Sequence, residues 1–166
     1  MSTNNVPNPF WLGDQLVLDW IFNPISWWSN YHYGKDAMDL RLGFAVLGYL
    51  LLVFSAVYNR SFIFLFLLLV AMSLLWLLRD VPRREWVQNN KTGKNIKRVE
   101  YFWIRMVDLA LLTFIIISTS SHSWFDMIFW VNMLAFIFII ILCAYLDATD
   151  TLPPNYHERK TAFQFS

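Results

Sequence analysis

Four long apolar stretches constrain this chain more than any other feature of its sequence. The stretches cover residues 42–58, 61–78, 104–118 and 127–146. A helix needs roughly 17 to 25 mainly apolar residues to cross a hydrocarbon core about 30 Å thick, and the stretches approach or reach that length. Only Asn59 and Arg60 separate the first two, so these helices must be antiparallel neighbours. The sequence therefore predicts an all-α, polytopic membrane protein with four transmembrane helices arranged as two hairpins.

The composition indicates that lipid surrounds most of the chain. Hydrophobic residues make up 57% and charged residues 15% of the sequence, against about 45–50% and about 25% in soluble domains. Cys143 is the single cysteine, which excludes an intramolecular disulfide and a Cys-based zinc cluster. It lies in an apolar stretch. We interpret it as a small buried apolar residue.

The basic residues gather on one side of the predicted bilayer. Each hairpin returns the chain to the side it left, so both termini and the central connection share a side. Eleven of the 13 basic residues fall in these parts, and only Arg60 lies in a connection on the other side. Because cytoplasmic loops carry the excess of Lys and Arg, we expect the termini and the central connection to face the cytoplasm.

The chain divides into an aromatic N-terminal segment, the first hairpin, a basic connection, the second hairpin and a tail. Their boundaries are 1–41, 42–78, 79–103, 104–146 and 147–166. In the connection, two short runs flank a turn-forming stretch that contains Gly93, a pattern compatible with an exposed β-hairpin. The tail contains Pro153 and Pro154, which favours an extended conformation.

The aromatic segment begins with a predicted amphipathic helix. Asn8 and Pro9 suit its cap and first position, and apolar residues then recur at helical spacing opposite Asp14. We expect a second Asn-Pro pair, Asn23 and Pro24, to end this helix. The Trp and Tyr rings that follow suit the headgroup zone. The segment is therefore expected to lie on the membrane or against a partner.

Two surfaces are predicted to contact partners, the aromatic segment and the basic connection. The contact residues expected there are Asn8, Pro9, Phe10, Trp11, Asp14, Trp20, Trp27, Trp28, Arg83, Arg84, Lys91, Lys94, Lys97 and Arg98. Clusters of Lys and Arg beside membrane helices attract anionic surfaces, and they also set orientation. The sequence leaves both uses of the basic connection open, with anionic lipid as one expected contact.

A few polar residues interrupt or flank the apolar stretches. Arg105 and Asp108 lie one helical turn apart at the start of the third stretch, where they suit either a proton or ion relay or an interfacial ion pair. Asn132 in the fourth stretch suits a hydrogen bond between helices. Asp36 is expected to cap the first spanning helix, with Asp39 in its opening turn.

The sequence offers no convincing catalytic or cofactor site. His32 and His122 suggest paired haem ligands, but the predicted topology puts them on opposite sides of the membrane and outside the spanning helices. The connection lacks the glycine and Lys-Ser/Thr spacing of a phosphate-binding loop. No nucleophilic triad or metal-binding carboxylate pair is present. We therefore expect a non-enzymatic protein without cofactors or a small-molecule substrate.

A short motif near the N-terminus consists of Asn8, Pro9, Phe10, Trp11, Leu12 and Asp14. Together with Met38, Arg41 and the two apolar helices that follow, this motif resembles the start of short membrane proteins of large eukaryotic DNA viruses such as the chlorella viruses. The resemblance covers about the first 80 residues; beyond Leu78 a second hairpin stands where that family has a polar C-terminal motif. It implies a minor capsid or internal-membrane component of the virion that ties the bilayer to an overlying protein shell.

Two alternatives remain open at this point. The paired hairpins and the run from Leu77 to Pro82 resemble prenylated-Rab-acceptor-like and reticulon-like proteins, which implies a role in ER or Golgi membrane shaping or trafficking. The aromatic extensions also suit an accessory subunit of a respiratory or photosynthetic complex in an organelle inner membrane. All three interpretations describe a structural membrane protein whose partners are the bilayer and other structural proteins.

Overall fold

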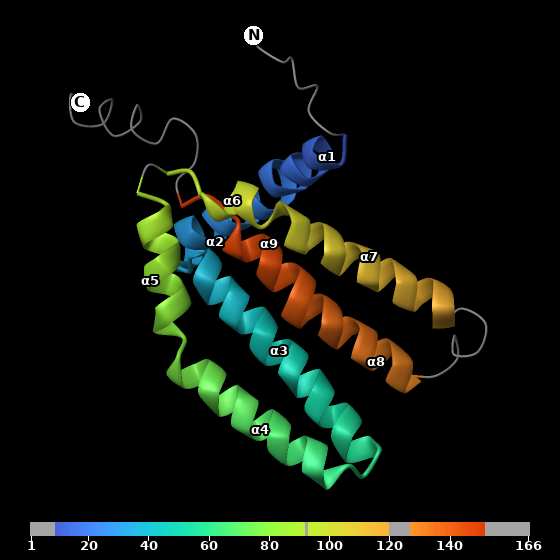
Figure 1. Ribbon diagram of the computed structural model, residues 1–166. Helices are drawn as coiled ribbons and strands as arrows, with labels where there is room; N and C mark the ends of the chain where they lie inside the picture. The colour runs from blue at the N-terminus through green and yellow to red at the C-terminus, as the bar shows by residue number, and fades with distance from the viewer. Residues whose placement is uncertain (1–8, 92, 120–126, 152–166) are drawn as a thin grey trace, which may run out of the picture.

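The computed structural model describes residues 9–91, 93–119 and 127–151. These residues are helical apart from short turns, which confirms the all-α prediction. Four long helices lie side by side, and shorter helices cross one end of them (Figure 1). We call that crossed end the charged end, and the opposite end the hairpin end.

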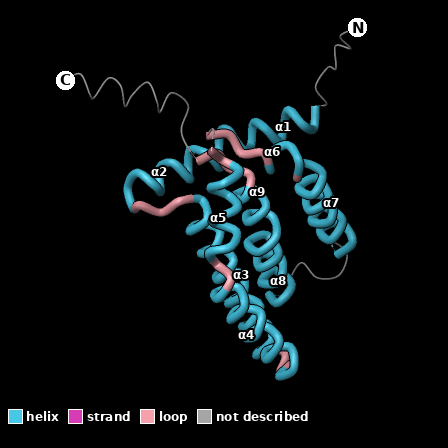
Figure 2. Tube along the Cα trace, turned by 60° about the vertical axis from the view of Figure 1, so that its left-hand side comes forward, coloured by secondary structure: helices cyan, strands magenta, loops and turns pink. Residues whose placement is uncertain are grey.

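The long helices form two antiparallel hairpins, and the second helix of the second hairpin is composite. α3 packs against both α4 and the composite helix, while α7 flanks the composite helix on its other side (Figures 1 and 2). The bounds are α3 (Ala37–Tyr58), α4 (Phe62–Leu77), α7 (Phe102–Thr119), and for the composite helix α8 (Met127–Phe136), the π-helical turn η2 (Ile137–Leu142) and α9 (Cys143–Asp147). Each predicted apolar stretch thus forms a helix.

Two helices in the described residues are long and apolar enough to cross a membrane. They are α3 and the composite helix from Met127 to Asp147. α4 meets the same criteria only together with the next helix, α5 (Asp80–Asn89), from which a bend of 47° separates it. The helices therefore support two spans, or three if the bent pair counts as one, rather than all four that the sequence predicts.

The N-terminal helices are α1 (Pro9–Val17), the π-helical turn η1 (Leu18–Phe22) and α2 (Asn23–Tyr33). The prediction that Asn23 and Pro24 end this helix is wrong, because the chain stays helical to Tyr33. Pro24 lacks an N–H and its ring clashes with the carbonyl four residues earlier in an α-helix. The wider π-helical turn immediately before it fits such a site. Gly34 then ends α2 in the left-handed conformation, at a φ of 64°.

The cap predicted for the first spanning helix is confirmed. The Asp36 side chain accepts a hydrogen bond from the Asp39 backbone N–H at 2.9 Å, and the Asp39 side chain accepts one from the Asp36 N–H at 3.3 Å. This reciprocal capping box satisfies two donors that a helix start leaves free. It fixes where α3 begins, shortly after the N-terminal helices.

Small residues bring α3 close to the composite helix. Ala45 and Gly48 of α3 and Ala135 of α8 are buried at the contact. A Cβ at Gly48 would lie 2.5 Å from Ile139 Cγ1 and 3.2 Å from the Ala135 carbonyl oxygen. Membrane helices associate mainly through such close packing, since the lipid supplies little hydrophobic drive between them.

The β-hairpin considered for the central connection is wrong. The connection forms α5 and a short helix, α6 (Lys97–Glu100), and no strand occurs in the described part of the chain. Trp86 explains why α5 is helical: it is 4% exposed and packs with Ala37, Met38 and Leu146, which places one helical face against the bundle. The turn-forming residues around Gly93 supply only the link between the two helices.

Candidate functional site

A buried ion pair fastens α1 to the charged end of the bundle. The side chains of Asp14 in α1 and Arg105 in α7 are both 0% exposed. Arg105 Nε donates to Asp14 Oδ1 at 2.9 Å, and Arg105 Nη2 donates to the second carboxylate oxygen. Nη2 also donates to the Arg98 carbonyl at 2.7 Å, and the guanidinium lies 5.6 Å from the Tyr145 ring centre. This two-point contact holds a charge that would be costly to leave unpaired.

Arg98 extends the network from the same end. Its guanidinium forms ion pairs with Asp150, at 3.0 Å, and with Asp19, at 2.6 Å. Its Nε also donates to the side-chain oxygen of Gln15. One arginine of the connection therefore links the N-terminal helices to the segment that follows α9.

The segment after α9 is the centre of this network. The Asp150 carboxylate accepts a hydrogen bond from the Asn95 N–H at 2.8 Å, and its own N–H donates to the Asn23 side chain at 2.9 Å. The indole N–H groups of Trp27 and Trp86 donate to the carbonyls of Asp150 and Thr149, each at 3.1 Å. Residues of α2, of α5 and of the link between α5 and α6 thus hold this segment. We call Asp14, Gln15, Asn23, Asn95, Arg98, Arg105 and Asp150 the polar network.

Two further ion pairs fix α5 and α9 to α3. Arg83 contacts both carboxylates of the capping box, Asp36 at 3.4 Å and Asp39 at a shorter distance. Burial acts to lower the pKa of Arg83, but these two carboxylates outweigh it and raise that pKa. Arg41 pairs with Asp147 at 3.4 Å. Charges of the predicted basic connection are therefore used to hold the fold together.

Four of the five buried side chains of the N-terminal helices are polar, while most of their large apolar side chains are exposed. The buried stripe along the platform, defined as residues 9–33, is Asp14, Leu18, Asn23, Ser26 and Ser29. The large exposed side chains are Phe10 (71% exposed), Leu12, Leu16, Trp20 (79%), Ile21, Ile25, Trp28, Tyr31 (85%) and Tyr33. An ordinary surface helix has the reverse arrangement. The exposed apolar residues, which we call the outer face, mark a contact surface.

The structure separates the predicted partner residues into two groups. Pro9, Phe10, Trp20, Trp28, Arg84, Lys91 and Lys94 are exposed. Asp14, Arg83 and Arg98 form the internal ion pairs above, and Lys97 pairs with Glu85 at 3.3 Å. Trp11 and Trp27 are half-buried, and Asn8 lies outside the described residues. The surface left for a partner is the outer face together with three exposed cations of the connection.

The polar residues of the predicted spans behave differently from the sequence-based interpretation. Arg105 pairs with Asp14 of α1 rather than with Asp108 of its own helix. Asn132 is exposed on α8, and among the described residues it does not form the expected hydrogen bond between helices. Within the described ranges, no three or more His, Cys, Asp or Glu side chains gather closely enough to hold a metal ion. His122 and the tail beyond Thr151 lie outside those ranges.

Sequence reasoning missed three buried members of the network, namely Asn23, Asn95 and Asp150. From its place in an Asn-Pro pair, Asn23 was expected to end a helix. Asn95 and Asp150 were expected to lie in loops. Each is nevertheless at most 8% exposed. Of the three, only Asp150 lies close to a predicted apolar stretch, the one that ends at residue 146, and no comparable signal marked Asn23 or Asn95.

The chain matches no protein-family model, no curated protein and no solved structure.

Proposed function

We propose that this protein is a non-catalytic structural membrane protein whose platform docks onto an overlying protein layer. The observation that carries the proposal is the inverted amphipathicity of the platform. The polar network fastens the buried stripe of the platform to the bundle. The outer face is therefore held rigidly on the side of the platform that points away from the bundle. Exposed Trp, Tyr and Phe side chains on a rigid support are the residues that dominate protein–protein contacts.

The proposal includes four membrane crossings, by α3, α4, α7 and the composite helix. These four run side by side with their connections at two opposite ends (Figures 1 and 2). α4 has 16 residues and α7 has 18, which correspond to about 24 and 27 Å at 1.5 Å per residue. Both lengths are near the roughly 30 Å of a hydrocarbon core, and modest thinning of the bilayer accommodates the difference. The platform then lies at the cytoplasmic headgroup level.

In its most specific form, the overlying layer is a viral capsid and the membrane is the internal membrane of the virion. This form depends on the resemblance of the motif from Asn8 to Asp14 to proteins of large eukaryotic DNA viruses. The exposed cations Arg84, Lys91 and Lys94 would add electrostatic contacts to the shell. Mass spectrometry of fractionated particles tests this form, because the protein must then co-purify with the membrane and shell of intact virions.

The docking itself is tested with the double variant Phe10→Ala/Trp20→Ala. Removing two exposed rings from the outer face should leave membrane insertion unchanged and abolish recruitment to the protein layer. The matched control is Phe62→Ala/Trp130→Ala, which removes the same ring types near the hairpin end. Recruitment that survives the first variant, or fails equally in the control, contradicts the proposal.

A second measurement separates docking from burial of the platform in the headgroup zone. In vesicles without partner proteins, an environment-sensitive probe on Trp20→Cys, in a Cys143→Ala background, should report water. A probe that reports hydrocarbon would mean that lipid covers the outer face. Tubulation of vesicles by the purified protein alone would instead favour membrane shaping, the role implied by reticulon-like proteins.

A further inference from the structure

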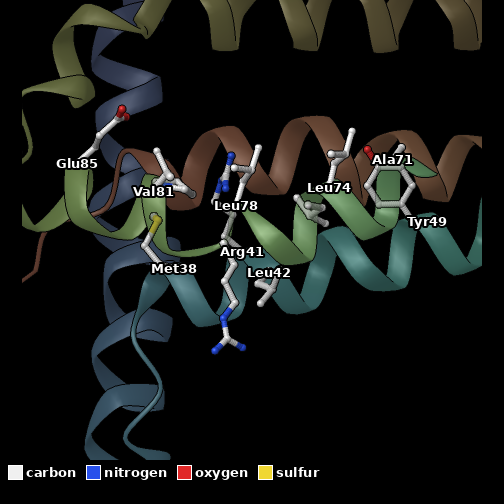
Figure 3. Close-up of a pocket in the computed structure, with 12 residues that line it drawn as sticks. Met38, Arg41, Leu42, Tyr49, Ala71, Leu74, Leu78, Val81 and Glu85 are labelled. Atoms are coloured by element: carbon white, nitrogen blue, oxygen red, sulfur yellow. The ribbon is translucent and has the colours of Figure 1, made fainter. Parts of the chain in front are cut away.

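A groove of about 420 Å³ runs along the flank of the bundle between α3, α4 and α5. Figure 3 shows Leu42 and Tyr49 of α3 facing it beside Ala71 and Leu74 of α4. Its walls are mainly apolar along the two long helices. Because these residues belong to the segments expected to lie in lipid, the natural occupant of the groove is apolar as well.

The length of the groove corresponds to one leaflet of a bilayer. Along α3 its lining runs from Met38 to Tyr49, which is about 16 Å at 1.5 Å per residue. Half of a hydrocarbon core of about 30 Å is roughly 15 Å. An acyl chain that enters at the charged end would therefore fill the groove and end near the middle of the bilayer.

The mouth of the groove at the charged end carries basic side chains. A second, polar cavity of about 300 Å³ shares Met38, Leu42 and Arg79 with the groove. It adds two cations and two carboxylates, Lys35, Arg83, Asp39 and Asp80, so basic groups outnumber acidic ones in its lining by one. The apolar and polar parts are thus continuous, as the two parts of a phospholipid require.

Donor groups remain available at this mouth. Arg79 forms its only described ion pair with its exposed neighbour Asp80, at 3.6 Å, and Lys35 forms none among the described residues. The Nε atoms of Arg41 and Arg83 lie in ion pairs with Asp147 and Asp36, each at 3.4 Å, so Arg79 and Lys35 are the donors left for a ligand. Phosphate oxygens suit such donors, and Arg contacts them with particularly favourable geometry.

We propose that the groove binds one acyl chain of an anionic phospholipid from the surrounding bilayer, with the lipid phosphate on Arg79 and Lys35. The proposal rests on the membrane location of α3 and α4, and it is independent of docking by the platform. This site differs from a general attraction between anionic lipid and the basic connection. Binding here requires both the apolar cavity for the acyl chain and the basic contact for the headgroup.

Native mass spectrometry of the full chain, purified in mild detergent with added phosphatidylglycerol or phosphatidylcholine, tests the site. We expect retained phosphatidylglycerol, and Arg79→Gln should reduce its retention about fivefold, the effect of roughly 1 kcal/mol per basic residue near a lipid surface. Arg84→Gln is the matched control, since Arg84 is exposed on α5 but lines neither cavity. An equal loss in both variants, or no preference for phosphatidylglycerol, overturns the proposal.

A second pair of variants tests the apolar part. Ala71→Trp fills the groove and should abolish retention of either lipid, whereas Ala110→Trp on the exposed side of α7 should not. Should Ala71→Trp fail to fold, phosphatidylglycerol with a photoactivatable acyl chain replaces it, used on the unaltered protein. Adducts are expected within residues 38–49 and 71–82. Adducts confined to α7 and α8 would overturn the proposal.

Discussion

The carboxylate of Asp14 and the guanidinium of Arg105, 91 residues apart in the chain, form an ion pair in which neither side chain is exposed to solvent. Arg105 lies at the start of an apolar helix, where a lone arginine would be expected to extend its side chain toward the headgroups. Instead α1 brings a carboxylate to it from above the bundle. The platform is therefore held by an electrostatic contact that needs both residues.

Removing one partner of this pair should destabilise the whole charged end. Asp14→Asn leaves the buried Arg105 without its counter-charge, and breaking a buried pair in this way costs about 3 to 5 kcal/mol. The loss should appear as a lower SDS concentration at the unfolding midpoint of the purified protein. The double variant Asp14→Leu/Arg105→Met removes both charges and should recover most of that stability. A double variant as unstable as Asp14→Asn would contradict this explanation.

Asp150→Ala should release the N-terminal helices without unfolding the hairpins. The Asp150 carboxylate bonds to Asn23, Asn95 and Arg98, which belong to three different parts of the charged end. We expect faster hydrogen exchange across residues 9–33 and little change in α3 and α8. Asp80→Ala is a suitable control, because the Asp80 carboxylate is exposed and pairs only with its neighbour Arg79 among the described residues. Unchanged exchange in Asp150→Ala would show that apolar contacts alone hold the platform.

Hydrophobic pattern and local capping chemistry were sufficient to predict much of this fold. All four apolar stretches are helical, and Asp36 caps α3 as its position before that helix indicated. These features depend on residues that are neighbours in sequence. Which side of the amphipathic platform contacts the bundle depends on residues that are distant in sequence. The hydrophobic pattern of the platform alone therefore did not predict that side.

The partner of Arg105 shows why the candidate site was harder to predict. From sequence, Asp108 is the nearest carboxylate at a helical spacing, and an i,i+3 pair is a sound local expectation. The actual partner, Asp14, comes from a helix that only the tertiary fold brings close. Asn95 and Asp150 are similar cases, since their loop character hid their burial at the meeting point of several helices.

Gly48→Ala should weaken the packing between the two hairpins. The added Cβ would meet Ile139 and the Ala135 backbone at the distances given above, and overpacking of this kind costs about 1 to 3 kcal/mol. Gly43→Ala provides the control on the same helix, since nothing lies within 4 Å of a Cβ there. The expected result is a lower thermal midpoint in detergent for Gly48→Ala alone. Equal midpoints for both variants would mean that α3 can move away from α8 without cost.

The four crossings proposed above would place the connection around Lys94 and the turn at Asn59 on opposite sides of the membrane. Both residues are exposed, and Cys143, the only cysteine, is 7% exposed. In a Cys143→Ala background, a membrane-impermeant maleimide added to sealed cytoplasmic-side-out vesicles should label Lys94→Cys, and Asn59→Cys only after detergent is added. This result is expected because eleven basic residues lie on the side proposed to be cytoplasmic. Labelling of both variants in sealed vesicles would show that α3 and α4 enter and leave by the same face, as a re-entrant hairpin does.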